Sequence, residues 1–221
     1  VDVANVKKLT CGYQASAILM NDGTLYLWGN KQAYANMDLY LSATGVHDLD
    51  FTLNYIVGLT GMRNAIYTGS RGLYDVVRAN IGEASEPIAA YLNGRKIESI
   101  TAANTSMALL LDDGSVCFAG DFASDTIPAP VLAEGEDFID IDAGSYHYTG
   151  LTNLGNVYTW GSYTLKQTEV PKGLDSVAEI HTGGFQSYAV NESGKLMDKW
   201  GLKGYLFGTD VRGADIFQRI I

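Results

Sequence analysis

The stretch from Phe138 to Gly161 reads FIDIDAGSYHYTGLTNLGNVYTWG, and it decides the fold because the chain repeats it. Three ungapped copies precede it, and one copy with a single extra residue follows it. The copies start 40, 51, 41 and 39 residues apart. Self-similarity at a period of about 40 residues is typical of propellers and other repeat architectures. In chain order the units start at Val6, Val46, Ile97, Phe138 and Val177.

Each unit predicts three strands joined by tight turns. An apolar pair three residues apart opens the unit, and a small residue follows where the chain must turn. A second strand then leads into Asp-Gly or a similar turn, the strongest local signal for a hairpin, because glycine adopts positive φ without strain. We therefore expect positive φ at Gly23, Gly114 and Gly155. The connections, such as Ile127–Leu132 and Thr168–Pro171, predict a possible fourth, outer strand, where proline is tolerated.

The repeats divide the whole chain, and we interpret residues 1–221 as a single domain. The predicted units are 6–45, 46–96, 97–137, 138–176 and 177–216, with 217–221 starting a sixth unit or a closing strand. One unit cannot cover its own apolar faces, so neighbours must stack around an axis. The expected fold is an all-β propeller of about five blades; the alternatives are an open arc or a segment of a seven-bladed propeller. Residues 70–96 hold an insertion of about ten residues.

The best-matching unit carries the pattern Ala-Gly-x-x-His, strand, Leu-x-x-x-Gly-x-Val-Tyr-x-Trp-Gly. This pattern resembles the regulator of chromosome condensation repeat family. The resemblance implies propellers, mostly seven-bladed, that serve as interaction platforms. They include nucleotide-exchange factors for small GTPases and a bacterial propeller that inhibits β-lactamases, whose short repeats are closer to those of this chain. The family histidine is present only at His147, where the resemblance implies a packed, hydrogen-bonded role.

Composition and charge exclude several partner classes. The net charge is −10, with 15 basic and 25 acidic residues, so nucleic acid and anionic membranes are not expected as partners. No apolar stretch approaches the length of about 20 residues that crosses a membrane, so membrane insertion is not expected. The chain starts with valine and without a leader, and we interpret it as a processed protein or an excised piece. An extracellular, cell-surface or virion location is favoured over the cytoplasm.

Neither catalysis nor metal binding is expected. The three histidines fall at different repeat positions, and a Gly-x-Ser-x-Gly nucleophile turn is missing, so the chain is interpreted as a non-enzyme without cofactors. The paired acids fit no calcium loop and are interpreted as solvated strand ends. The two cysteines are interpreted as small, buried and unpaired. These residues are His47, His147 and His181; Asp48, Asp50, Asp140 and Asp142; and Cys11 and Cys117.

Aromatic residues divide into core and candidate contact positions. Trp28, Trp160 and Trp200 share one repeat position, which favours packing between blades. Several of the 14 tyrosines fall in turns, where rigid aromatic side chains suit an interface. The turn after the first strand of every unit should lie around one mouth of a central channel. The predicted binding residues on these turns are Tyr13, Gln14, Asn54, Asn104, Thr105, Tyr146 and Phe185.

The sequence therefore favours a recognition module that binds a protein or a glycan through one propeller face. Such a module would suit a bacterial surface protein or a phage particle. Two alternatives remain open: a regulator resembling a guanine-nucleotide exchange factor, and a structural or oligomerisation domain of a larger assembly.

Overall fold

The computed structural model describes residues 2–12, 15–30, 45–51, 56–60, 65–68, 95–104, 106–120 and 129–203. Among these residues a single short 3-10 helix, Val3–Asn5, precedes fifteen strands. We number the three-stranded sheets 1 to 5 in chain order. Their strands are β1 Val6–Cys11, β2 Ala15–Met20, β3 Leu25–Gly29; β4 Val46–Phe51, β5 Ile56–Thr60, β6 Ala65–Thr68; β7 Ile97–Ala102, β8 Ser106–Leu111, β9 Val116–Gly120; β10 Phe138–Ala143, β11 His147–Thr152, β12 Val157–Gly161; and β13 Glu179–Gly183, β14 Gln186–Val190, β15 Leu196–Gly201.

Every sheet is an antiparallel meander of three consecutive strands. The first, or inner, strands are β1, β4, β7, β10 and β13, and four of the five begin at the residue that opens the repeat unit. In those four the register shifts near the start of the strand, for example between Phe138 and Asp140. An extra residue of this kind increases local twist, which suits strands that converge on one axis. The predicted all-β repeat is thus confirmed.

The hairpin turns contain the predicted backbone conformation. Gly23, Gly114 and Gly155 have φ of +85°, +74° and +76°. Gly114 is also close to the segment that leads into the next repeat, because a Cβ added there would lie 2.6 Å from the Cβ of Asp137. Glycine is therefore required at this position for two reasons: the turn needs a positive φ, and the neighbouring segment leaves no room for a Cβ.

Replacing Gly114 with alanine should lower the free energy of unfolding by about 2 kcal/mol, from a strained φ plus the contact with Asp137. Gly194 provides the matched control, since its φ is also +74° but nothing lies within 4 Å of an added Cβ. Gly194→Ala should cost about 1 kcal/mol, from backbone strain alone. Urea denaturation measures both values, and equal losses would contradict the close approach at Gly114.

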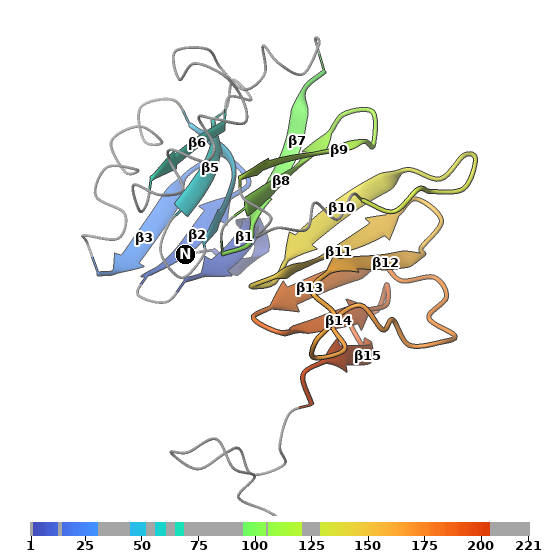
Figure 1. The fold of residues 1–221 in the computed structure, drawn as a ribbon. Helices are drawn as coiled ribbons and strands as arrows, with labels where there is room; N and C mark the ends of the chain where they lie inside the picture. The colour runs from blue at the N-terminus through green and yellow to red at the C-terminus, as the bar shows by residue number, and fades with distance from the viewer. Residues whose placement is uncertain are drawn as a thin grey trace, which may run out of the picture.

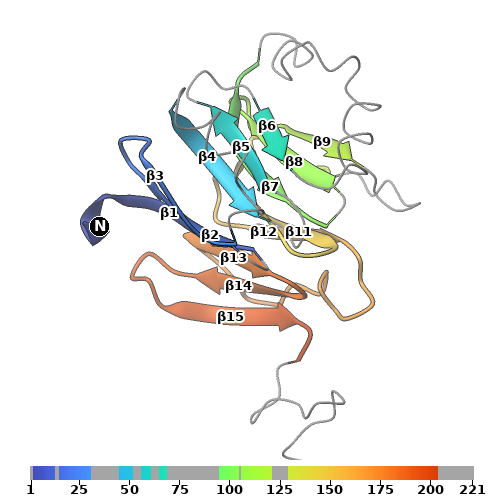
Figure 2. The ribbon, with the colours of Figure 1, turned by 90° about the vertical axis from the view of Figure 1, so that its left-hand side faces the viewer.

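Apolar side chains join each sheet to the next. Four clusters link sheets 1 and 2, 2 and 3, 3 and 4, and 4 and 5. In the last of these, Leu151 of β11 packs with Val177, Ile180 and Trp200 of the following repeat. Figures 1 and 2 show the sheets following one another in chain order with their inner strands together. The core therefore lies between sheets, as stacked blades require.

The structure corrects three details of the expected packing. Trp160 and Trp200 are buried, but Trp28 is 45% exposed, although it occupies the same repeat position. Cys11 is exposed rather than buried, and both cysteines are free. Residues 168–171 form no strand, since Pro171 cannot donate to a ladder. Val170 instead packs against the apolar cluster between sheets 4 and 5.

Some predictions lie outside the described residues. These include most of the insertion at 70–96, the segment 217–221 and residues 127 and 128 of the proposed strand at 127–132. The other four residues of that segment, 129–132, form no strand. Within the described part of the chain, no helix is long and apolar enough to cross a membrane.

Candidate functional site

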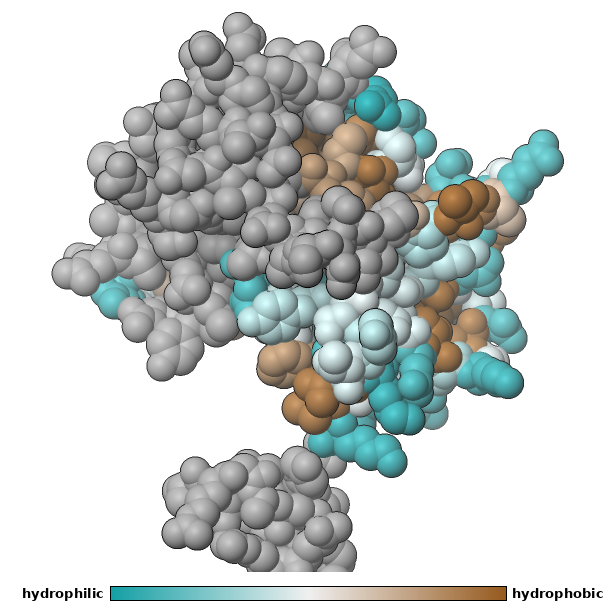
Figure 3. Space-filling model, viewed as in Figure 1, coloured by the Kyte–Doolittle hydropathy of each residue, from teal (hydrophilic) through white to brown (hydrophobic). Residues whose placement is uncertain are grey.

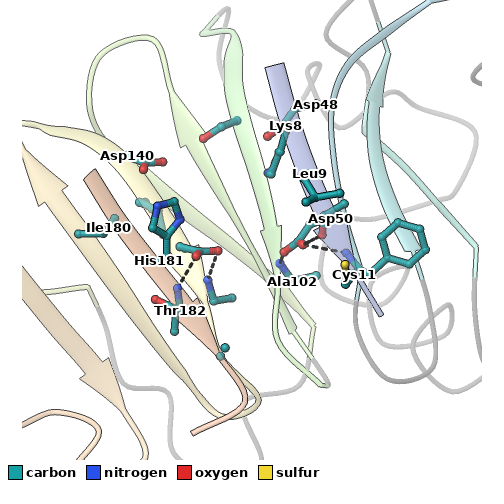
Figure 4. Close-up of a pocket in the computed structure, with 18 of the residues that line it drawn as sticks. Lys8, Leu9, Cys11, Asp48, Asp50, Ala102, Asp140, Ile180, His181 and Thr182 are labelled. Carbon is teal, nitrogen blue, oxygen red and sulfur yellow. Dashed lines mark hydrogen bonds and ion pairs between the residues drawn. The ribbon is translucent and has the colours of Figure 1, made fainter. Parts of the chain in front are cut away.

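A pocket of about 940 Å³ lies among the five inner strands. Residues of β1, β4, β7, β10 and β13 all line it, and the turns that follow β1, β7, β10 and β13 lie at its border. Figure 4 shows Lys8, Asp48, Asp50, Asp140 and His181 around this space. The pocket is therefore the central channel of the stacked sheets, and its walls are polar because alternate residues of each inner strand point toward it.

The residues at the third and fifth positions of each repeat form two tiers, and all of them except Thr101 and Glu179 line the channel. The tiers contain the two aspartate pairs that the sequence placed at solvated strand ends. That interpretation is wrong for Asp48 and Asp50, which are 5% and 9% exposed. The side chains of Asp140 and Asp142 are half-buried. In chain order the third-position residues are Lys8, Asp48, Ser99, Asp140 and Glu179, and the fifth-position residues are Thr10, Asp50, Thr101, Asp142 and His181.

The carboxylates are buried because they accept hydrogen bonds from the next sheet. Asp48 accepts from the amide of Ile100 at 2.9 Å, and Asp50 accepts from the amide of Ala102 at 2.8 Å. Two blades later, Asp142 of sheet 4 accepts from the amide of Thr182 of sheet 5 at 2.6 Å. An inner strand is the edge of its sheet, so its outward N–H groups have no strand partner. An aspartate from the preceding blade satisfies them and fixes the spacing of the blades.

Hydroxyl groups complete the tier of fifth-position residues. Thr10 and Thr101 each donate to Asp50 at 2.9 Å, and Thr101 lies 3.4 Å from a carboxylate oxygen of Asp142. One hydrogen-bonded chain therefore crosses sheets 1 to 4, and the amide of Thr182 extends it to sheet 5. No sequence signal distinguished these threonines from ordinary strand residues.

The channel charges perturb one another. Burial opposes the charge of Lys8, but Asp48, 2.9 Å away, and Asp50 outweigh it and raise the pKa of the ammonium. Burial, and next the charge of Asp50, raise the pKa of Asp142 to about 7. Burial also raises the pKa of Asp140. Burial and the neighbouring carboxylate thus disfavour the charged form of Asp142, and a cationic group beside it would favour that form.

The turns at the channel mouth are linked through their backbones. The amide of Asn104 donates to the carbonyl of Ser145 at 3.0 Å, and the amide of Ser145 donates to the carbonyl of Gly184 at 2.7 Å. Beside them the rings of Tyr146 and Phe185 stack, with centroids 6.1 Å apart and planes at 26°. Tyr146 is 51% exposed and Phe185 37% exposed. The structure therefore gathers three of the predicted binding residues on one rim, while Tyr13, Gln14, Asn54 and Thr105 lie outside the described residues.

His147 is buried beneath this rim. Its Nε2 lies 2.9 Å from the hydroxyl of Ser187, a pairing that resembles a base and its nucleophile. Both side chains have no solvent-exposed area, and burial lowers the pKa of His147 to about 4. In the described structure Nδ1 has no hydrogen-bond partner, so no carboxylate orients the ring. A catalytic base needs access and orientation, so this pair links sheets 4 and 5 structurally. A Cβ at Gly144 would lie 2.3 Å from the imidazole, which explains the glycine.

A second polar cluster, which the sequence did not indicate, forms outside the channel around Glu136. Its carboxylate accepts from Asn156 at 2.8 Å, Thr152 at 2.7 Å and Tyr158 at 2.8 Å. These hydrogen bonds lower the pKa of Glu136, and they tie the connecting segment before β10 to the β11–β12 hairpin. The described residues contain no group of three metal-ligating side chains.

Comparisons with known proteins agree with this geometry. Residues 138–162 match the regulator of chromosome condensation (RCC1) repeat. No curated protein sequence matches the chain.

Solved structures are similar at the level of the fold. The ectodomain of the receptor kinase CR4 from Physcomitrella patens is 17% identical, with a TM-score of 0.63, over 89% of this chain and 53% of that one. Prp20p from Saccharomyces cerevisiae is 15% identical, with a TM-score of 0.63, over 97% and 64%. Human WBSCR16 is 15% identical, with a TM-score of 0.61, over 85% and 58%. The chain spans between about half and two thirds of these structures. It therefore contains a repeat of the regulator of chromosome condensation type, and its sheets have the fold of part of such a propeller.

Proposed function

We propose that this chain is a non-catalytic module that binds a protein through the channel mouth formed by its first turns. The observation that carries the proposal is the stacked pair Tyr146 and Phe185, exposed beside the channel. Their turns are held by the backbone hydrogen bonds that run from sheet to sheet. Aromatic side chains on a rigid frame lose little conformational entropy on association, and such residues supply binding hot spots.

The acidic channel beneath the rim favours a partner with basic side chains. The acids of both tiers outnumber Lys7 and Lys8 among the residues that line the pocket. A lysine or arginine inserted at the mouth would meet the carboxylates of Asp140 and Asp142, whose pKa values are raised because their charges are disfavoured. Electrostatic complementarity of this kind increases association rates and excludes acidic partners.

The geometry favours a protein over a glycan. A sugar ring stacks on the free face of an aromatic ring, and the stacking of Tyr146 on Phe185 leaves fewer such faces than two separate rings would. On the face that Figure 3 shows, the coloured apolar residues form separate patches between polar ones, the mixed character of a non-obligate protein interface. Prp20p, which has the same fold, has described binding properties to Gsp1p and histones. A bacterial-surface or phage setting stays a prediction.

We also infer that the five sheets form an open arc rather than a closed five-bladed ring. The inference is supported by Leu9, which is 62% exposed, while the equivalent residues Leu49, Ile100, Ile141 and Ile180 are at most 5% exposed. In a closed ring sheet 5 would bury Leu9 as the other sheets bury its equivalents.

Capture from an extract of the source organism tests the binding proposal. The immobilised wild-type chain is compared with Tyr146→Ala, Phe185→Ala and the control Tyr163→Ala, whose residue is 75% exposed outside the aromatic pair. Proteins that the wild type and the control retain, but the two rim variants lose, are specific for the rim. A glycan array probed with the same four proteins covers the other ligand class.

For a protein identified in this way, Tyr146→Ala should weaken binding by about 1–3 kcal/mol, because it removes an anchor from the centre of the contact. Folding should change by less than about 1 kcal/mol, since the ring is half exposed. Calorimetric titration and thermal unfolding give both quantities. Binding that survives both rim substitutions but is lost with Tyr163→Ala would place the contact elsewhere.

A further inference from the structure

One face of sheet 1 has no packing partner within the described structure. Residues paired across neighbouring strands point to the same side of a sheet. Two such rows cross sheet 1, and three of their residues, Leu9, Tyr26 and Trp28, are 62%, 46% and 45% exposed. We call this surface the leading face. Its rows are Leu9–Ile18–Tyr26 and Cys11–Ser16–Trp28.

The other four sheets show what normally covers a leading face. Each leading face packs on the opposite, trailing face of the sheet before it. The central contact places an apolar cross-strand pair of the trailing face against the fourth residue of the next repeat unit, as with Leu151 and Val157 against Ile180. Leu19 and Leu25 form the same pair before Leu49. The repeat therefore predicts that the leading face of sheet 1 packs on a trailing face that carries such an apolar pair.

A matching trailing face is uncovered at the other end of the arc. In sheet 5, Val190 pairs with Leu196 at the register of Leu151 and Val157. Leu196 is 50% exposed and Val190 only half-buried. The two open faces are therefore complementary types of surface rather than two copies of one type.

Polar positions agree with the same pairing. Asp48 accepts the amide of the fourth residue of the next inner strand, and Glu179 occupies the position of Asp48 in sheet 5. The side chain of Glu179 is 62% exposed, and it would meet the amide of Leu9. His147 of sheet 4 bonds to Ser187 of sheet 5. Gln186 occupies the position of His147 in sheet 5, and Ser16 occupies the position of Ser187 in sheet 1, so this polar pair would also form between sheets 5 and 1.

We propose that the leading face of sheet 1 binds the trailing face of sheet 5 of a second copy of this chain. The proposal rests on the open arc inferred above, and not on the binding rim. The contact is heterologous. Each copy binds one neighbour through its leading face and another through its trailing face, so association continues from copy to copy. It removes the exposed apolar surface of Leu9, Tyr26 and Trp28 from water.

The first test is the oligomeric state of the 221-residue chain, measured by sedimentation velocity over a concentration series. A reductant is present because the exposed Cys11 would otherwise form disulfides between copies. The wild type should show a mass that rises with concentration above the 23.8 kDa of one chain. Leu9→Asp and Leu196→Lys should each weaken association about 10- to 100-fold, the effect of losing one buried leucine contact. Val131→Asp, at an apolar residue that is 97% exposed away from both faces, should leave it unchanged.

Mixing the two variants gives the decisive result. The Leu9→Asp chain keeps an intact trailing face, and the Leu196→Lys chain keeps an intact leading face. Each alone should be monomeric, whereas the mixture should form a 1:1 dimer that grows no further. A monomeric wild type at every concentration overturns the proposal; slow hydrogen exchange at Leu9 in that monomer would then indicate a closed ring. Neither outcome changes the rim experiment, because Tyr146 and Phe185 lie on neither face.

Discussion

Trp160→Ala should lower the free energy of unfolding by about 3–5 kcal/mol, the usual cost of truncating a buried tryptophan. The indole is 4% exposed. It packs on Tyr148 with ring centroids 5.8 Å apart, on Phe138 at 5.6 Å, and edge-on to Phe118 of the preceding sheet at 6.3 Å. An alanine would leave a cavity between sheets 3 and 4, which share this cluster. Denaturant unfolding monitored by far-ultraviolet circular dichroism measures the change.

Trp28→Ala is the matched control, because the two tryptophans share a repeat position. Its loss should stay below about 1 kcal/mol, since Trp28 is 45% exposed. The comparison is made at low protein concentration, so that association through the leading face does not contribute. Equal losses for the two variants would show that a sheet covers Trp28 in solution, which would contradict the open arc.

The architecture was predictable because the repeat determines local structure. A hairpin glycine such as Gly114 and an apolar opening such as Phe138 act within one unit, and both behave as the sequence indicated. The same locality explains the failure at Trp28. Its side chain is like that of Trp160, but its burial depends on whether another sheet precedes it, which no pattern within the unit encodes.

The channel was not predictable for a related reason. Asp48 and Asp50 alternate along a strand, as solvated acids also do. They are buried because they accept hydrogen bonds from the amides of Ile100 and Ala102, which lie on the edge strand of the next sheet and have no strand partner there. That contact joins residues about 50 positions apart. The aromatic rim was predicted in part. The sequence placed Tyr146 and Phe185 on equivalent turns, but only the structure shows that their rings stack.

The two fifth-position aspartates, Asp50 and Asp142, should respond in opposite directions to the same substitution. Asp50 accepts four hydrogen bonds, from Thr10, Thr101 and the amides of Phe51 and Ala102. Asparagine would turn an NH₂ group toward two of these donors, and buried donors without an acceptor cost about 1–3 kcal/mol each. Asp50→Asn should therefore destabilise the protein by about 2–4 kcal/mol.

Asp142 occupies the same repeat position, but burial and Asp50 raise its pKa to about 7 from 3.8. Between these pH values the folded chain holds a proton that the unfolded chain has released, so this group makes stability fall as pH rises from about 4 to about 7. His147 has the opposite effect, since its pKa falls to about 4 from 6.5 and its contribution grows as pH rises through that interval. In the wild type the contributions of Asp142 and His147 to the pH dependence of the free energy of unfolding therefore oppose one another.

Asp142→Asn removes the pH dependence of stability that Asp142 causes, and it removes the negative charge that Asp50 repels. At pH 8 the variant should be more stable than the wild type by about 1–3 kcal/mol, less than the full shift implies because the amide of Ala143, now 3.0 Å from a carboxylate oxygen, loses an acceptor. Below pH 4 the advantage should vanish, because Asp142 is then protonated in both states. Thermal unfolding from pH 3 to pH 8 measures both aspartate variants. A destabilised Asp142→Asn at pH 8 would mean that the carboxylate is charged and needed in the channel, as Asp50 is.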